Sequence, residues 1–251
     1  QVMLGLGYQA RFPEILSQQS QAALVPGEYN YRDEKRRAIV ELHTERTLRH
    51  FPVAPDIDQM AQRLVAIVVA GQEVRTFSAE DLLPVLCVHG AKDFWERISW
   101  IADIAELVER QKDLNWDAAF RTAEGLRAER MLHLGLALAS ELLDAALPEE
   151  IRKRVRGDGE ACTIAREVGE RIRRGGAEGM STAARFRFRR RMVRGAVDGW
   201  RYAARLAVIP AEEDWDLVRL PEALAPLYIA LRPLRLLRKY GWLRRQREGA
   251  S

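Results

Sequence analysis

Ser78-Ala79-Glu80-Asp81 begins the part of the chain that decides its fold. A serine followed three residues later by a carboxylate, directly before an apolar run, is typical of a helix N-terminus, here with aspartate in place of the usual glutamate. From this point almost every segment has the apolar spacing of an amphipathic helix. The spacing predicts helices over residues 79–90, 93–111, 117–125, 127–146, 149–156, 160–174, 181–208 and 221–239.

Upstream of Ser78 the pattern is mostly extended. Two pairs of β-rich runs, each around a short turn, predict four short strands: 28–32 with 37–43, and 65–70 with 73–77. Short helices are expected near residues 13–23 and from Pro55 to residue 63. The fold class is therefore α+β and mostly helical. We expect a partial α/β domain over residues 1–77 and an all-α domain, which would hold the substrate or acceptor, over residues 78–251.

Composition excludes several classes of protein. The 251 residues are 47% hydrophobic and 30% charged, which is unlike a disordered tail, a collagen-like repeat or a disulfide-built secreted scaffold. Cys87 and Cys162 lie far apart and form neither a disulfide framework nor a metal-ligand pair. No run approaches the roughly 18 apolar residues that span a bilayer, and no signal-peptide pattern is present. These features predict a cytoplasmic protein in a reducing compartment.

Charge is distributed unevenly along the chain. Residues 1–150 carry 16 basic and 24 acidic side chains, whereas residues 151–251 carry 24 basic and 12 acidic ones, for a net charge of +4. A concentrated positive field attracts phosphates, whether on nucleotides, nucleic acid or anionic lipid. The alternative is a solvated helix whose arginines pair with the acidic first half. The arginines in question are Arg185, Arg187, Arg189, Arg190, Arg191 and Arg194.

One expected strand carries two chemically active side chains. Because side chains alternate between the faces of a strand, Val40 and Leu42 lie on one face, and Glu41 and His43 lie on the other. A carboxylate and an imidazole therefore share a face. Taken alone, a strand glutamate is better explained by a solvent-facing or edge position, and a lone histidine by a structural role.

The segment His89–Asp103 is the densest cluster of polar and aromatic residues. If it is helical, four polar side chains line one face: Lys92, Glu96, Ser99 and Asp103. Lys92 is then a candidate phosphate contact, and Asp103 a candidate for orienting an arginine or a substrate hydroxyl. The alternative is a simple Lys92–Glu96 ion pair beside tryptophans that anchor the core.

The other motifs in the sequence say less about function. Asp56-Ile57-Asp58 has the D-x-D spacing with which two carboxylates share a metal ion, but no apolar strand surrounds it. We interpret both aspartates as residues at the start of a helix. The sequence contains no P-loop and no G-x-G-x-x-G motif.

Taken together, three segments resemble the uncharacterised bacterial nucleotidyltransferase family of the polymerase-beta-like superfamily. They are Val40–His43, Leu86–Asp103, and Trp215–Leu220 with Leu227–Arg235. The resemblance covers nearly the whole chain, and the central segment is its most specific part. Two positions depart from the family pattern: Thr44 stands where tryptophan is usual, and Asp93 where histidine is usual.

The resemblance implies a reaction and a site. In this superfamily two carboxylates on one strand and a third on a neighbouring strand hold two Mg²⁺ ions, and a nucleoside monophosphate passes from NTP to an acceptor hydroxyl. The V-E-L-H strand matches the third carboxylate, which makes Glu41 the expected catalytic residue and metal ligand. The expected substrate-binding residues are His43, His89, Lys92 and Asp103. Neither the nucleotide nor the acceptor follows from the sequence.

The Gly-Ser turn and the D-x-D strand of this superfamily do not occur upstream of Glu41, and residues 4–8 match the end of the helix that follows that strand. We therefore expect a C-terminal portion that holds one of three carboxylates. It should be inactive alone, because Mg²⁺ sheds water reluctantly and a single carboxylate binds it weakly. The alternative is a non-catalytic binding module in which the basic helix Arg185–Arg205 contacts nucleic acid or an anionic surface.

Overall fold

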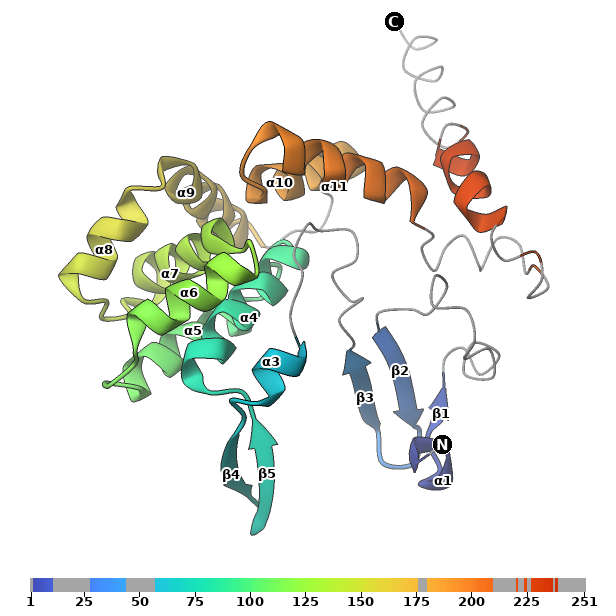
Figure 1. Cartoon of the computed structure of the whole chain (residues 1–251), viewed down its shortest axis with the longest axis horizontal. Coiled ribbons are helices and arrows are strands. Elements are labelled where there is room, and N and C mark those ends of the chain that lie inside the picture. Colours follow the sequence, from blue (N-terminus) through green and yellow to red (C-terminus); the bar gives the residue numbers. More distant parts are fainter. Residues whose placement is uncertain are drawn as a thin grey trace, which may run out of the picture. The chain divides into compact units, whose positions relative to one another are not determined.

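The structure, a computed structural model, describes residues 2–10, 28–43, 57–175, 180–209, 220, 224, 227–236 and 238 (Figure 1). The chain divides into two compact units, one of residues 1–51 with 200–251 and one of residues 52–199. The architecture is α+β and mostly helical, as the sequence predicts, and its strands form two small antiparallel sheets. The assignment of domains to residues 1–77 and 78–251 stays a prediction.

The first unit contains a three-stranded sheet of order β1-β2-β3. Helix α1 (Val2–Gly5) precedes its strands, which are β1 (Gln9–Ala10), β2 (Glu28–Asp33) and β3 (Ala38–His43). The predicted hairpin is confirmed, and the two-residue β1 is an addition to it. Asp33 fixes the turn, because its Oδ1 accepts hydrogen bonds of 3.0 Å from the amides of both Lys35 and Arg36. The register then places the buried Tyr31 opposite Val40.

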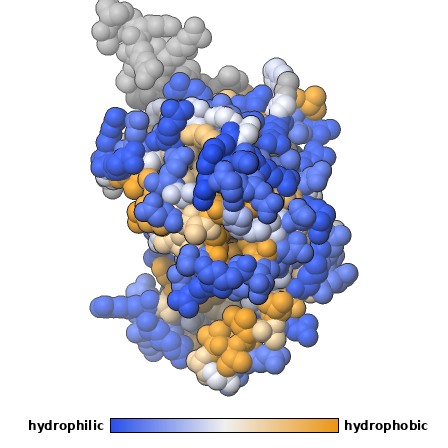
Figure 2. All heavy atoms as spheres, turned by 90° about the vertical axis from the view of Figure 1, so that its left-hand side faces the viewer, coloured by the Kyte–Doolittle hydropathy of each residue, from blue (hydrophilic) through white to orange (hydrophobic). Residues whose placement is uncertain are grey.

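A second hairpin belongs to the other unit. Helix α3 (Ile57–Ala61) leads to β4 (Val65–Val69) and β5 (Gln72–Thr76), which pair as predicted. Ala70 and Gly71 both adopt positive φ angles, 51° and 79°, as a two-residue hairpin turn requires. Every residue of β4 is exposed, and Figure 2 shows a hydrophobic patch at the lower end, where this hairpin extends from the helices. The hairpin therefore presents an apolar strand edge.

Helix α7 (Glu129–Leu143) is the centre of the helical unit. Nine consecutive residues, 131–139, are buried, which is typical of a helix surrounded on all sides. The surrounding helices are α4 (Ala79–Lys92), α5 (Ile98–Arg110), α6 (Trp116–Gly125), α8 (Glu149–Arg156) and α9 (Gly159–Arg173). Gly135 allows α4 to approach closely, since a Cβ there would lie 2.4 Å from Cys87 Sγ.

At the start of α4, Ser78 caps the helix as the sequence predicts, but the side chain of Asp81 makes contacts that the sequence does not predict. Ser78 Oγ accepts a hydrogen bond of 3.3 Å from the Asp81 amide and caps the helix. The Asp81 side chain does not complete a capping box. Its oxygens accept hydrogen bonds from Arg63, in the turn after α3, and from Thr122 of α6. Asp58 lies in the first turn of α3, in agreement with the helix-start interpretation, and Asp56 lies outside the described residues.

The C-terminal half corrects one predicted helix. Helix α8 (Glu149–Arg156) coincides with the prediction. The single helix over 181–208 is wrong: the chain forms α10 (Thr182–Met192) and α11 (Ala196–Val208). The break occurs because Val193 is extended and Gly195 has a φ of +81°. Residues 228–236 are helical within the predicted 221–239, whereas the expected helix 13–23 and most of Trp215–Leu220 lie outside the described residues.

Both cysteines lie in helices of the helical unit. Cys87 is buried and Cys162 half-buried, and neither forms a disulfide. Burial raises the pKa of the Cys87 thiol well above its usual range. None of the helices in the described ranges combines the length and the apolarity needed to cross a bilayer.

Candidate active site

Glu41 lies within β3, and its side chain is exposed. The register pairs Glu41 with Asn30 of β2 and Val40 with Tyr31. Because side chains alternate, Glu41 lies on the face opposite to the buried Tyr31, where a ligand can reach it. The backbone of His43 continues the same strand, but its side chain lies outside the described part of the structure.

The donor chemistry at Glu41 suits Mg²⁺, which prefers carboxylate oxygens, so Glu41 fits as one ligand. Within the described ranges, however, no three side chains of His, Cys, Asp or Glu form a group that could hold a metal ion. A dinuclear Mg²⁺ site needs several carboxylates at once. The described residues thus contain one suitable ligand and not a complete metal site.

His89 and Lys92 meet at the C-terminal end of α4, with Asp93 between them. Asp93 Oδ2 lies 3.8 Å from His89 Nδ1 and 3.6 Å from Lys92 Nζ. The His89 ring also packs edge-to-face on Trp100, with the ring centres 5.1 Å apart. Positive side chains are favoured here, because the C-terminal end of a helix carries partial negative charge. Asp93 therefore lies beside two of the expected substrate-binding residues, His89 and Lys92.

The expected helix over 93–111 is wrong at its start. Phe94 and Trp95 adopt left-handed conformations, with φ angles of 61° and 54°, and α5 begins only at Ile98. The reason is tertiary: the Trp95 ring is fully buried and lies so close to Gly90 that a Cβ there would be 2.4 Å from it. Two buried aromatic side chains therefore hold a turn that α-helical spacing does not predict.

This turn separates the four polar residues that a continuous helix would align. Lys92 ends α4, Glu96 lies in the turn, and Ser99 and Asp103 are exposed on α5. Glu96 pairs with Arg185 at 3.6 Å instead of with Lys92. The structure therefore brings His89 and Lys92 together, and Asp103 lies on a different helix from them. A substrate contact by Asp103 stays a prediction.

The arginine-rich segment makes many contacts within its own unit. Arg189 donates a hydrogen bond of 2.9 Å to the Lys92 carbonyl, and Arg171 of α9 donates to the Phe94 carbonyl. Further ion pairs are Arg185–Glu96, Arg191–Glu160, Arg191–Glu167, Arg194–Glu129 and Arg194–Asp158. Arg190 donates to the Val193 carbonyl, and Arg187 is exposed. These contacts favour pairing of the arginines within the protein, but of the partners only Glu96 and Glu129 belong to the acidic first half that the alternative named.

Asp158, the N-cap of α9, is a buried carboxylate that the sequence-based candidates did not include. Its Oδ1 accepts from the Ala161 amide at 3.1 Å, and its Oδ2 lies 3.0 Å from Arg194 Nη2 and 3.3 Å from His133 Nδ1. Burial alone raises a carboxyl pKa, but the hydrogen bonds from Arg194, Ala161 and His133 outweigh it and lower the pKa of Asp158 to about 2. Burial lowers the pKa of His133. The motif Gly157-Asp158-Gly159 was the available signal, since aspartate before a helix is a preferred N-cap.

The chain belongs to a family described as uncharacterised nucleotidyltransferases, whose family model matches residues 1–144. The match includes Glu41, His43, His89, Lys92 and Asp103, and it ends before the arginines of α10. It places the protein in a class of enzymes that act on nucleotides. A search of curated proteins and a search of solved structures each found no similar protein.

Proposed function

We propose that this protein acts in the transfer of a nucleoside monophosphate from NTP to an acceptor hydroxyl, with Glu41 as a metal ligand. The supporting observation is the family match over residues 1–144, within which β3 presents Glu41 on an exposed face. In this reaction the acceptor oxygen bonds to the α-phosphorus as the bond to the β-phosphate oxygen breaks. The hydroxyl loses its proton, and pyrophosphate leaves.

Mg²⁺ is the cofactor we propose for the intact enzyme. When bound, it would neutralise charge on the triphosphate and orient the reacting oxygens. Glu41 would supply one carboxylate oxygen to it, and further ligands would have to join Glu41, because the described residues contain no complete group. Glu41 by itself is expected to bind the ion weakly.

The cluster at the end of α4 is a proposed contact for the substrate. Asp93 lies within 4 Å of both His89 Nδ1 and Lys92 Nζ, which limits the positions that the two side chains can take. An ammonium group held in this way suits a phosphate oxygen, and the imidazole suits a phosphate or hydroxyl. Asp103, exposed on α5, is proposed to orient a substrate hydroxyl.

Glu41→Gln tests the central part of the proposal, with Glu34→Gln as its control. Glu34 is an exposed carboxylate in the turn of the same hairpin, so it matches Glu41 in charge and exposure. The measurement is binding of Mn²⁺, as a spectroscopic substitute for Mg²⁺, followed by the electron paramagnetic resonance signal of the free ion. Weakened binding in Glu41→Gln alone is expected. Equal binding by the two variants would remove Glu41 from the proposal, as would Mg²⁺-dependent pyrophosphate release that Glu41→Gln leaves unchanged.

Polyanion binding by α10 is the second candidate, and the structure supports it less. Arg189, Arg191 and Arg194 already bond to carbonyls or carboxylates of the same unit, so a polyanion would have to compete with these contacts. Arg187 is exposed and is the best single probe. If α10 binds nucleic acid, affinity for a generic oligonucleotide falls steeply with salt, and Arg187→Gln reduces that dependence. No affinity at low salt excludes the nucleic-acid form of this function.

A further inference from the structure

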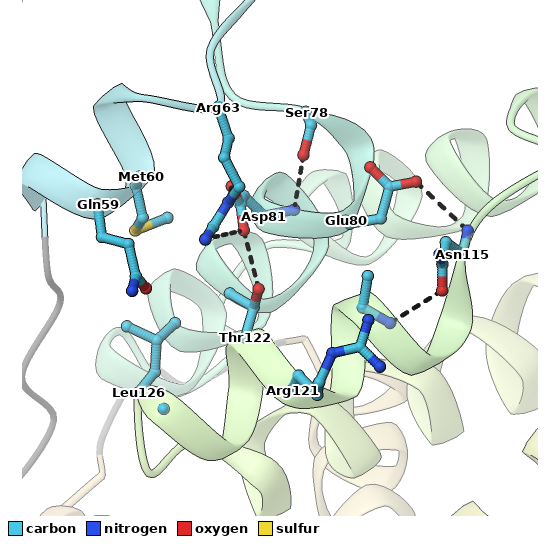
Figure 3. Close-up of a pocket in the computed structure, with 12 residues that line it drawn as sticks. Gln59, Met60, Arg63, Ser78, Glu80, Asp81, Asn115, Arg121, Thr122 and Leu126 are labelled. Carbon is cyan, nitrogen blue, oxygen red and sulfur yellow. Dashed lines mark hydrogen bonds and ion pairs between the residues drawn. The ribbon is translucent and has the colours of Figure 1, made fainter.

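The helical unit contains a pocket whose lining includes none of the residues discussed as catalytic or substrate-binding. It has a volume of about 630 Å³ and is lined by α3, the first turn of α4 and one face of α6. This volume lies within the range of small-molecule sites. Figure 3 shows Gln59 and Met60 on one side of the pocket, with Glu80 and Asn115 on the other.

A rigid network forms one wall of this pocket. Asp81 is buried, and its carboxylate accepts hydrogen bonds of 3.0 and 2.9 Å from Nε and Nη2 of Arg63. Thr122 Oγ1 donates a third hydrogen bond of 2.8 Å to Asp81. A forked, two-bond arginine–carboxylate pair fixes both side chains and cancels their charges. The network thus ties α4 and α6 to Arg63 and contributes no net charge to the pocket (Figure 3).

The remaining charged residues of the lining also balance. Glu80 Oε1 accepts a hydrogen bond of 3.3 Å from the main-chain amide of Asn115. Arg121, on α6, is exposed. The charged side chains that line the pocket are therefore two arginines and two carboxylates. A nucleoside triphosphate carries several negative charges and needs an excess of positive groups. The pocket therefore does not suit a polyphosphate.

The polar groups that line the pocket are of a mixed kind. Amides, hydroxyls, a carboxylate and a guanidinium share the lining with apolar surface, part of which comes from Met60 and Leu126. These groups are Gln59, Ser78, Glu80, Asn115, Arg121 and Thr122. Together they both donate and accept hydrogen bonds, as hydroxyl groups do. We propose that this pocket binds a small molecule that is rich in hydroxyl groups and carries at most one charge.

This binding does not depend on Glu41 or on nucleotidyl transfer, and it can be tested separately. Gly125 lines the pocket, and a Cβ there meets no atom within 4 Å, so Gly125→Phe fills the pocket without a clash at the Cβ. Gly159, at the start of α9, also has no atom within 4 Å of a Cβ and does not line the pocket. Gly159→Phe is the matched control. Equal unfolding midpoints for the two variants show that both are folded.

The probes are myo-inositol and D-ribose at millimolar concentration, detected by saturation-transfer NMR on the whole chain. We expect a signal from at least one probe that Gly159→Phe retains and Gly125→Phe loses. Arg121→Leu, which changes only an exposed side chain, should weaken binding about tenfold or more, because a hydrogen bond to a charged group is lost. If neither probe binds, if Gly125→Phe and Arg121→Leu both retain the signal, or if ATP competes for the pocket, the inference is wrong.

Discussion

Gly135→Ala is expected to destabilise the helical unit, and Cys87→Ala is expected to compensate for it. At Gly135 an added Cβ would lie 2.4 Å from Cys87 Sγ, 3.1 Å from Ile104 Cδ1 and 3.2 Å from Trp95 Cη2. All three neighbours have an exposed fraction of 0%. Because none of them can move into solvent, the contact must be relieved by shifts within the core.

The magnitude follows from two opposing effects. Replacing a helical glycine by alanine favours the helix by about 1 kcal/mol. Forcing an extra methyl group into a filled core costs about 1–3 kcal/mol, towards the upper end where the neighbours are fixed. We expect a net loss of about 1–2 kcal/mol and a Tm lower by roughly 2–8 °C. Cys87→Ala alone removes one buried sulfur atom and should cost about 1 kcal/mol.

The double variant distinguishes this contact from a general loss of packing. In Gly135→Ala/Cys87→Ala the new methyl group occupies space close to that vacated by the sulfur, so stability should return to within about 1 kcal/mol of the wild type. The resulting coupling free energy is about 2 kcal/mol, in the range found for residues in contact. Gly159→Ala, whose Cβ meets nothing within 4 Å, is the control. Because only helix propensity changes there, it should raise stability by up to about 1 kcal/mol.

Urea unfolding, followed by the circular dichroism of the helices, measures the free energy of unfolding of the wild type, the two single variants, the double variant and the Gly159→Ala control. The coupling free energy comes from the double-mutant cycle of the first four. Additive losses in the double variant would refute the reasoning. They would mean that α4 and α7 adjust elsewhere and that Gly135 is not needed for the contact with Cys87. A Gly135→Ala protein as stable as the wild type would refute it more directly.

Three further predictions concern other parts of the chain. Asp158→Asn should cost about 2 kcal/mol at pH 7, because a pKa of about 2 in the folded chain, against 3.8 as the usual value, stabilises the fold above pH 3.8. That contribution is lost as the pH falls through 2, so urea unfolding at pH 3 should show about half the difference in free energy of unfolding between Asp158→Asn and the wild type. A difference that does not change with pH would contradict the lowered pKa of Asp158. Lys92→Ala, made in an enzyme with a complete metal site, should strongly lower the rate of nucleotidyl transfer and change the Tm only slightly. The Tm should change little because the ion pair of Lys92 with Asp93 contributes at most about 1 kcal/mol to stability. A large loss of both rate and Tm would favour a packing role for Lys92. Val68→Lys, at a residue 74% exposed on β4, should reduce self-association at high protein concentration in sedimentation experiments, and an unchanged profile would exclude this strand edge as the contact.

Elements determined by their own sequence were predictable. Helix α8 follows Pro148 and ends before Gly157, and its predicted bounds agree with the structure. The β2–β3 hairpin was predictable because an aspartate turn separates two β-rich runs. In these cases the residues that fix the backbone lie within a few positions of it, so a local pattern contains the information.

Features determined by distant residues were not predictable. The turn at Phe94 and Trp95 interrupts a good helical pattern, because the Trp95 ring packs against Gly90 and Gly135, the latter forty positions downstream. The prediction of four polar residues on one helix face was wrong for this reason. The break at Gly195, in contrast, carried a signal in the sequence, since an isolated glycine in a helical run lowers the expectation of a continuous helix.

The expected site residues follow the same division. The sequence indicated that β3 exposes Glu41, because alternation along a strand is local. It did not indicate that Asp93 would lie beside both His89 and Lys92, because that depends on how α4 ends. The pocket of α3, α4 and α6 had no local signal at all, since its lining comes from three separate segments.

The end of α4 is bonded to α9 and α10 through main-chain carbonyl oxygens, which do not depend on the side chain at the acceptor position as an ion pair does. Arg189 and Arg171 bond to the carbonyl oxygens of Lys92 and Phe94, and every amino acid has such an oxygen. Substitutions at the acceptor positions therefore leave the acceptors in place, whereas loss of either arginine removes a bond. The side chain at position 93, which takes no part in either bond, can therefore change without loosening the attachment.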